Sequence, residues 1–389
     1  MANLLAGNVL VVQVECLSPV SNAVLGGIIS GALNYERVEE IYGSVNGFCG
    51  ILNHDLIDLA SQPQQIVRDL TFTPGAALGT FDWFDRSTEE IETLFSAFEE
   101  YNIRFLFTIG GPKTQSIALE LFQMAQQRAY AIQIISIPDT IYNDLPITDH
   151  SLGYGSVSKF ITTTIRELSC YTAAVANHDL VNVIEIAADK SNWLMASALL
   201  NVTPFHIVLL PSENFSEEKF LKAVQNVLKS NHYCCVVASD FLVDDEGNYI
   251  SGKTIGTAEK LKEILEESLE VRVLTTKLGA LQYSAAHFLS KTDVDEAYAC
   301  GVKAVGFALD GLTGKMVTIL RSEGNRYGVE YGMADLANIC GHEKSIPNHW
   351  FDEGGKLNAN FSKYALPLIQ GNVVIPENNG LPKFATLKK

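Results

Sequence analysis

The sequence predicts an α/β protein with two Rossmann-like, doubly wound domains and mainly parallel sheets. Short apolar runs rich in Val and Ile alternate with amphipathic segments from one end of the chain to the other. These runs are nearly continuous in apolar residues, which is typical of parallel strands that are covered on both faces. The length of 389 residues exceeds what one hydrophobic core usually holds, so two domains are expected.

The expected elements follow from local patterns. In the segment 88–101, Ile91, Leu94 and Phe98 recur at helical spacing, and Ser87 or Thr88 is placed to cap the helix. A second amphipathic helix is expected at 217–230 by the same spacing. Strands are expected at the apolar runs 8–14, 103–108, 131–137, 181–187, 205–210, 233–239 and 271–274.

Composition and charge exclude several classes of protein. The chain is 47 % hydrophobic and carries a formal net charge of -17, which argues against nucleic acid and anionic membranes as partners. No basic segment precedes a long apolar run near the start, and no run approaches the ~20 apolar residues of a membrane span. Seven cysteines at irregular spacing do not make a disulfide framework. Cytoplasmic residence is therefore expected.

The loops that follow the strands are where a ligand should bind in parallel sheets. These loops are 15–22, 109–114, 138–149, 187–193, 211–215 and 239–241. A phosphate-binding turn needs glycines, but the first loop begins with Glu15 and Cys16. Gly110 and Gly111 permit a tight turn, which is a commoner role for such a pair than ligand binding. Lys113 fits either a phosphate contact or a solvated charge.

Three aspartates, Asp139, Asp144 and Asp149, fall within eleven residues. Their carboxylates could hold a divalent cation, although Asp is also a common turn former. Further along, Asp189 and Lys190 fit an ion pair or a helix start as well as a binding site. The residues alone leave these alternatives open.

Several segments together resemble the phosphofructokinase family, in particular its pyrophosphate-dependent bacterial branch. The resemblance rests on SNAVLGGIISGA (21–32), TIGG (108–111), IPDTIYNDLPITDHSLGYGSVSKF (137–160), LLPSENFSEEKFL (209–221) and ALPLIQGN with GLPKFATLK (365–388). It implies a phosphoryl-donor domain at 1–150 and a sugar-phosphate domain at 151–389, with the chain crossing back near 270–330. It also implies an active cleft between the domains and a dimer or tetramer.

Against the family's motifs, many site positions carry other residues. In the donor site, Gly110 and Gly111 match, whereas Lys113 replaces an Asp that handles magnesium. Asp82 replaces an Arg that contacts the donor. The family's first Gly-Gly pair falls on Glu15 and Cys16.

The departures continue in the sugar-phosphate site. Tyr142 occupies the position of the catalytic base, and Asp139 that of a phosphate-contacting Lys. Asp144 is retained and is the only candidate metal ligand. The remaining matched positions are Thr140, Asp189, Ser212, Asp240 and Tyr283.

These departures favour a non-catalytic subunit or regulator, with no confident catalytic residue and no confident cofactor. Losing a base costs ~10²–10⁴ in rate and losing a charge-stabilising donor on the order of 10²–10³. Such a subunit would form a homo-oligomer or pair with an active paralogue. One alternative is a repurposed enzyme whose acidic cleft takes a cationic or unphosphorylated substrate. Another is residual phosphorylation of fructose 6-phosphate by pyrophosphate or ATP, which would need Mg²⁺.

Overall fold

The computed structural model divides the chain into two compact units. Unit 1 consists of Met1–Ser156, Tyr283–Lys344 and Gln370–Lys389, and unit 2 of Val157–Gln282 and Ser345–Ile369. The sequence-based division placed the boundary at 150/151 with the chain crossing back near 270–330, and in the structure the chain returns to unit 1 at Tyr283 and again at Gln370. The structure describes residues 5–15, 17–80, 87–188, 190, 192–201, 203–211, 214–252, 255–324, 326–352 and 357–389.

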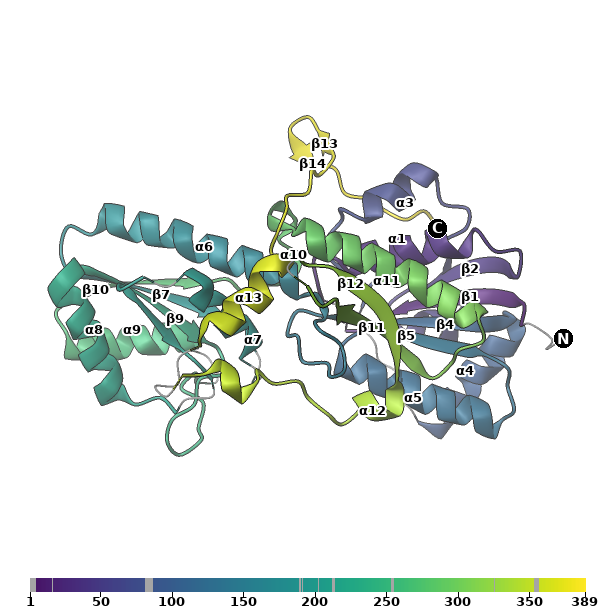
Figure 1. The fold of residues 1–389 in the computed structure, drawn as a ribbon, viewed down its shortest axis with the longest axis horizontal. Coiled ribbons are helices and arrows are strands. Elements are labelled where there is room, and N and C mark those ends of the chain that lie inside the picture. The colour runs from purple at the N-terminus through teal and green to yellow at the C-terminus, as the bar shows by residue number, and fades with distance from the viewer. Residues whose placement is uncertain are drawn as a thin grey trace. The chain divides into compact units, whose positions relative to one another are not determined.

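Unit 1 is a parallel sheet between two layers of helices (Figure 1). Its strands are β1 (Gly7–Gln13), β2 (Val38–Ser44), β3 (Leu56–Asp58), β4 (Ile103–Gly110), β5 (Gln133–Thr140), β6 (Leu152–Gly153), β11 (Lys315–Arg321), β12 (Val329–Asp335), β13 (Glu377–Asn378) and β14 (Leu381–Pro382). Its helices are α1 (Ser21–Ala32), α2 (Cys49–Leu52), α3 (Gln64–Leu70), α4 (Thr88–Glu100), α5 (Pro112–Gln127), α11 (Lys291–Leu309) and α12 (Leu336–Ile339). A short helix, α10 (Leu281–Ser284), lies at the boundary between the units.

The main sheet of unit 1 has the strand order β12-β11-β5-β4-β1-β2-β3, with β6 beside β5. The strands β2, β1, β4, β5 and β11 are parallel to one another. At the two edges, β12 and β3 run antiparallel to their neighbours. The parallel centre of the sheet brings the carboxyl ends of β1, β4 and β5 to the same side.

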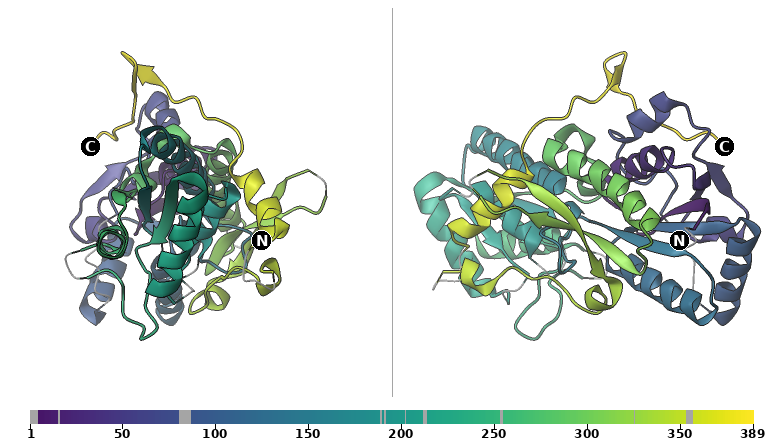
Figure 2. Two further views of the ribbon diagram at one scale, coloured as in Figure 1. Left: turned by 90° about the vertical axis from the view of Figure 1, so that its left-hand side faces the viewer. Right: turned by 45° about the vertical axis from the view of Figure 1, so that its right-hand side comes forward.

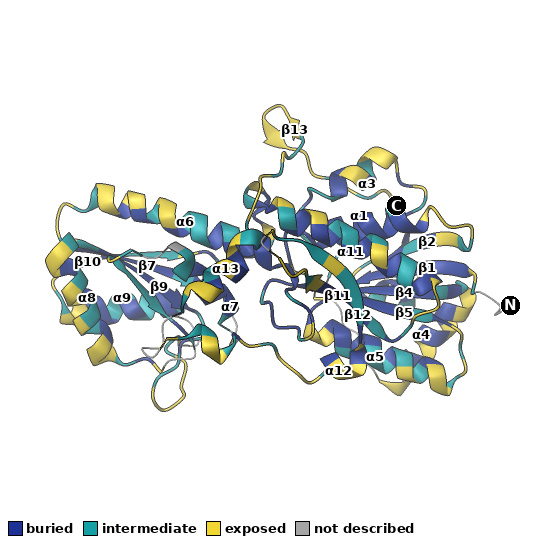
Figure 3. Ribbon diagram, viewed as in Figure 1, coloured by how far each residue is buried: buried dark blue, intermediate teal, exposed yellow. Residues whose placement is uncertain are grey.

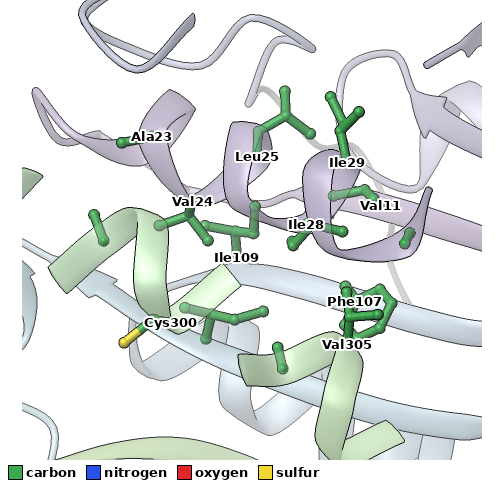
Figure 4. Close-up of a cluster of buried hydrophobic side chains, with 14 of the residues drawn as sticks. Val11, Ala23, Val24, Leu25, Ile28, Ile29, Phe107, Ile109, Cys300 and Val305 are labelled. Atoms are coloured by element: carbon green, nitrogen blue, oxygen red, sulfur yellow. The ribbon is translucent and has the colours of Figure 1, made fainter. Parts of the chain in front are cut away.

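Side chains on β1 alternate between two hydrophobic cores. Val9 and Val11 face the layer that contains α1, α3 and α11, and Figure 4 shows Val11 in this core. Leu10 and Val12 face the layer that contains α4 and α5. Both faces of the sheet are therefore covered, which confirms the predicted fold class.

Two helices that are far apart in the sequence, α1 and α11, contact each other through glycines. A Cβ atom on Gly27 would clash with the backbone oxygen of Tyr298, and one on Gly301 would lie 2.8 Å from the backbone nitrogen of Ile28. Only glycine allows backbones to approach this closely. Figure 4 shows the side chains of Val24, Ile28, Cys300 and Val305 that fill the core next to this contact.

Unit 2 contains a smaller sheet in which all strands are parallel, in the order β10-β7-β9-β8. Val183 and Val236 of this sheet pack against one helical layer, and Trp193 packs against Tyr364 with ring centroids 5.3 Å apart. Figure 2 shows the unit from two further directions. Its elements are α6 (Tyr154–Val175), β7 (Leu180–Ile186), α7 (Trp193–Ala198), β8 (His206–Leu209), α8 (Glu217–Asn231), β9 (Tyr233–Ser239), α9 (Thr257–Ser268), β10 (Arg272–Lys277) and α13 (Ala359–Leu368).

All seven predicted strands are present, with ends shifted by a few residues. Of the two predicted caps, Ser87 and Thr88, the side chain of Ser87 caps α4 by accepting a hydrogen bond of 3.2 Å from the backbone nitrogen of Glu90. The strand β5 extends through Thr140, so the loop expected at 138–149 begins later than the sequence indicates. None of the helices within the described ranges has the length and apolar character needed to cross a membrane.

Candidate active site

The carboxyl-terminal edge of the unit 1 sheet brings several predicted site residues together. Glu15 follows β1, Gly110 ends β4, and Asp139 lies near the end of β5. These strands are neighbours in the order β5-β4-β1, and they are parallel. The structure therefore places three of the predicted site loops side by side.

The first pair at this edge is an ion pair between Lys113 and Glu15. The Nζ atom of Lys113 lies 2.6 Å from Oε1 of Glu15, and both side chains are about half exposed, at 46 % and 50 %. An exposed pair of this kind contributes only ~0–1 kcal/mol to stability. The pair has an electrostatic consequence, because the Glu15 carboxylate offsets the charge of the Lys113 ammonium, which would otherwise attract a phosphate.

The Gly110–Gly111 turn has a steric explanation. Gly110 has a φ of 158°, and a Cβ atom on it would clash with Thr114 Oγ1 and the backbone oxygen of Val14. The Thr114 hydroxyl donates to that same oxygen at 2.7 Å. A Cβ atom on Gly111 would meet only Thr140, at an ordinary 3.5 Å. Close packing of strand and helix thus explains Gly110 without a ligand.

Asp139 is completely buried at the end of β5. One of its oxygens accepts a hydrogen bond of 2.5 Å from Ser18, and the other accepts one from Ser21. The two hydroxyls are themselves 3.0 Å apart. A buried carboxylate requires such partners. Both oxygens of Asp139 are thus held by groups of the same unit.

Tyr142 contacts Tyr283 directly. Their hydroxyl oxygens are 2.8 Å apart, which places one phenol as donor and the other as acceptor. The Tyr142 backbone nitrogen also donates to Thr140 Oγ1 at 3.2 Å. A phenol, with a reference pKa of about 10, is a poor base at neutral pH. The position expected to hold a general base therefore holds a phenol that is paired with a second phenol.

Lys344 lies beside this segment, and no role was predicted for it from the sequence. Its Nζ donates to Asn143 Oδ1 at 3.2 Å and to the backbone oxygen of Asp149. Its backbone nitrogen donates to the backbone oxygen of Asp144 at 2.8 Å. Burial of the ammonium lowers the pKa of Lys344 to about 7. In the sequence it lies within HEKSIP (342–347), and no residue pattern there marks it as a site residue.

A buried charged network follows directly after the 138–149 segment. Arg321 pairs with Asp149 at 2.9 Å, and Asp149 contacts His150 Nδ1 at 3.0 Å. The other ring nitrogen of His150 lies 2.7 Å from Glu296, which also accepts a hydrogen bond of 2.6 Å from the Tyr327 hydroxyl. We call these five residues the His150 network. It ties the segment to α11 and β11.

The two central groups of the His150 network have strongly altered pKa values. Burial alone would lower the pKa of His150, but the charges and hydrogen bonds of Glu296 and Asp149 raise it to about 9. Burial would raise the pKa of Asp149, but His150 and Arg321 lower it to about 2. At neutral pH the imidazolium is therefore charged and lies between two carboxylates.

The three aspartates of the segment do not converge on a metal site. Asp139 is bonded to serine hydroxyls, and Asp149 to Arg321 and His150. Asp144 lies close enough to Lys344 for its negative charge to raise the pKa of that ammonium, against the larger effect of burial. Within the described part of the chain, no group of three His, Cys, Asp or Glu side chains is arranged to hold a metal ion. The three carboxylates therefore do not form one cation site, and Asp144 as a single metal ligand stays a prediction.

In unit 2, Asp240 follows β9 and accepts a hydrogen bond of 2.8 Å from the backbone nitrogen of Ala188. It lines a hollow of about 490 Å³ together with Glu185, Phe241 and Tyr249. Glu185 accepts a hydrogen bond of 2.7 Å from the backbone nitrogen of Ala258. The hollow thus combines two carboxylates with two aromatic rings. The remaining predicted site residues, Cys16, Asp82, Asp189 and Ser212, lie outside the described residues.

Sequence comparison identifies the class of protein to which this architecture belongs. The family model described as "Phosphofructokinase" matches residues 8–308. The chain belongs to the phosphofructokinase family.

Pyrophosphate-using members of this family are similar to the chain over nearly its whole length. It is 32 % identical to the pyrophosphate--fructose 6-phosphate 1-phosphotransferase of Halomonas elongata, over 96 % of this chain and 94 % of that protein. It is 30 % identical to the protein of the same name from Methylococcus capsulatus, over 98 % and 96 %. The crystal structure of a pyrophosphate-dependent phosphofructokinase from Nitrosospira multiformis is 32 % identical, with a TM-score of 0.92 and coverage of 98 % and 96 %.

Proposed function

We propose that this chain is a non-catalytic member of the phosphofructokinase family that acts as a structural or regulatory subunit. The observation that carries the proposal is the state of Tyr142. This residue stands where the family's base is expected, and its hydroxyl is paired with that of Tyr283 at 2.8 Å. Phosphoryl transfer depends almost wholly on positioning and electrostatics, so losing the base and its neighbouring cations removes most of the catalysis.

Two further contacts of unit 1 support the proposal. Asp139, at a position where the family has a phosphate-contacting Lys, is saturated by two serine hydroxyls. Lys113, the one cation that could replace a lost donor contact, is paired with Glu15. A pyrophosphate anion would meet the Glu15 carboxylate beside Lys113, and the buried charge of Asp139 would repel it from a distance. Under this proposal the chain acts by associating with a second copy or with an active paralogue.

The test is a direct assay for phosphoryl transfer. The purified chain is incubated with fructose 6-phosphate, Mg²⁺ and either pyrophosphate or ATP, and the Halomonas elongata relative is assayed in parallel. We expect no turnover above the blank. Turnover that falls in the variant Tyr142→Phe would show that the phenol takes part in the reaction, and the proposal would then fail in favour of residual activity.

The acidic hollow of unit 2 favours a second candidate function, in which the chain acts on a cationic or unphosphorylated substrate. Asp240 supplies negative charge, as does Glu185, whose carboxylate lies 3.8 Å from Lys277 Nζ. The rings of Phe241 and Tyr249 supply apolar surface. Carboxylates beside aromatic faces suit a cation. A thermal-shift screen against amines and neutral sugars tests this candidate, with Asp240→Asn as the variant that should lose any stabilisation. A screen without a stabilising compound would remove it.

A further inference from the structure

A short hairpin near the carboxyl terminus stands away from unit 1. Residues 372–383, which we call the arm, form β13 and β14 and project beyond α3 and α11 in both Figure 1 and Figure 2. Val373 and Ile375 at its base pack against the core of unit 1. The side chains of Val374 and Leu381 are 88 % and 71 % exposed, the highest values among the large hydrophobic residues that the structure describes. Figure 3 shows the arm as exposed.

Unit 1 also has a hollow with apolar walls, which suits the apolar side chains of the arm. It has a volume of about 590 Å³ and lies between α3 and α11. Val67, Phe72 and Val294 give it apolar walls, and the rest of the lining consists of Ser30, Arg68, Thr71, Asp295 and Tyr298. The Asp295 carboxylate is paired with Lys291 at 2.7 Å, which leaves Arg68 as the charge available to a partner. We call this hollow the α3–α11 groove. None of its lining residues belongs to the arm of the same chain.

The arm and the groove share the same supporting helices. The arm begins beside the start of α11, where the backbone nitrogen of Lys291 donates to the oxygen of Gly371 at 3.4 Å. It ends beside α3, where Lys383 pairs with Asp69 at 2.8 Å. Both features therefore lie on the α3–α11 side of unit 1. A two-fold axis through this side would place the arm of each copy over the groove of the other, as an isologous dimer requires.

The charges of the two features are complementary. Glu377 lies on β13 and is exposed, and Arg68 lies on α3 at the groove and is also exposed. Neither side chain has an ion-pair partner among the residues that the structure describes. A chain that carries both the apolar arm and the groove, with one unmatched charge on each, is complementary to itself.

We propose that two copies of this chain associate by exchanging arms. The arm of each copy lies in the α3–α11 groove of the other, where Val374 and Leu381 contact the apolar walls. Glu377 then pairs with Arg68 of the partner subunit. Burial of apolar side chains that water otherwise surrounds supplies the driving force, and the ion pair fixes the register.

Charge reversal tests the proposal, with sedimentation velocity of the full chain over a range of concentrations as the measurement. The wild-type chain should sediment as a dimer. Arg68→Glu and Glu377→Arg should each raise the dimer dissociation constant by at least about tenfold, since like charges then face each other. The double variant should return to within about threefold of the wild type, because the pair is restored with its signs exchanged.

Two further variants separate association from folding. Val374→Asp should weaken the dimer while leaving the thermal unfolding of dilute protein unchanged, because the side chain is 88 % exposed. Glu100→Arg, on α4 at the opposite face of the sheet, is the matched control and should leave the dimer intact. A monomeric wild type would overturn the proposal. So would single reversals without effect, or a double variant no tighter than the singles.

Discussion

The His150 network makes a prediction about the pH dependence of stability. The pKa of His150 is about 9 in the folded protein and 6.5 for an ordinary histidine. Each pH unit between these values corresponds to about 1.4 kcal/mol. The proton on His150 therefore contributes on the order of 3 kcal/mol to the free energy of unfolding. Because the pKa is raised on folding, this contribution is complete below pH 6.5 and is lost as the pH rises to 9.

Lys344 acts in the opposite direction in the same pH range. Burial lowers its pKa to about 7. The free-energy cost of burying the charged ammonium therefore disappears as the pH rises and the ammonium loses its proton. The slopes of His150 and Lys344 therefore oppose each other in the wild-type protein. The carboxyl groups of the region interfere little, because the pKa of Asp149 is about 2 and that of Asp293 about 6.

The assay is urea unfolding at intervals from pH 6.5 to 9, followed by circular dichroism. His150→Gln should be less stable at every pH, and its free energy of unfolding should rise with pH because only the titration of Lys344 then remains. Lys344→Met should show the reverse, a free energy of unfolding that falls as the pH rises. Identical slopes for the wild type and His150→Gln would refute the assignment of a charged imidazole at neutral pH.

Three other substitutions have defined outcomes. Gly27→Ala should destabilise unit 1 by about 1–3 kcal/mol, because the added methyl would clash with a backbone oxygen of α11. Gly306→Ala on that helix meets open space and should be neutral or stabilising in the same urea assay. Ile147 has a φ of 64°, so Ile147→Gly should raise the free energy of unfolding by about 1 kcal/mol, and a loss would contradict the strain. Deleting residues 385–389 should speed amide hydrogen exchange at 73–79, because the backbone nitrogen of Ala385 donates to Thr73 Oγ1 at 2.8 Å. Unchanged exchange would show that the terminus does not hold this turn.

The strands that the sequence predicted are those whose signal is local. β1, β4, β5, β7 and β9 are buried on both faces and therefore appear as continuous apolar runs. The strand β12 lies at an edge of the sheet and mixes half-buried with exposed positions, so no such run marks it. β11 pairs with β12 and with β5, and of these two partners the sequence predicted only β5.

The sequence predicted which residues lie at the candidate site, but not which other residues they contact. The sequence placed Asp139, Tyr142 and Tyr283 at the site through the family motifs. It could not show that Ser18 and Ser21 bind Asp139, because these partners are 121 and 118 residues away along the chain. The bond between His150 and Glu296 spans 146 residues and was missed for the same reason. Propensity and periodicity carry no information on contacts at such separations.

The glycine contact between α1 and α11 has a consequence for biosynthesis. A nascent chain that has emerged only as far as the end of β6 has completed β1, β4 and β5 but lacks α11, which supplies Ala297, Cys300 and Val305 to the core. At that stage α1 and α3 cover this face of the sheet only in part, while unit 2 is being translated. Complete burial of this core therefore requires α11, which follows most of unit 2 in the chain, and a partly covered sheet of this kind is prone to aggregation.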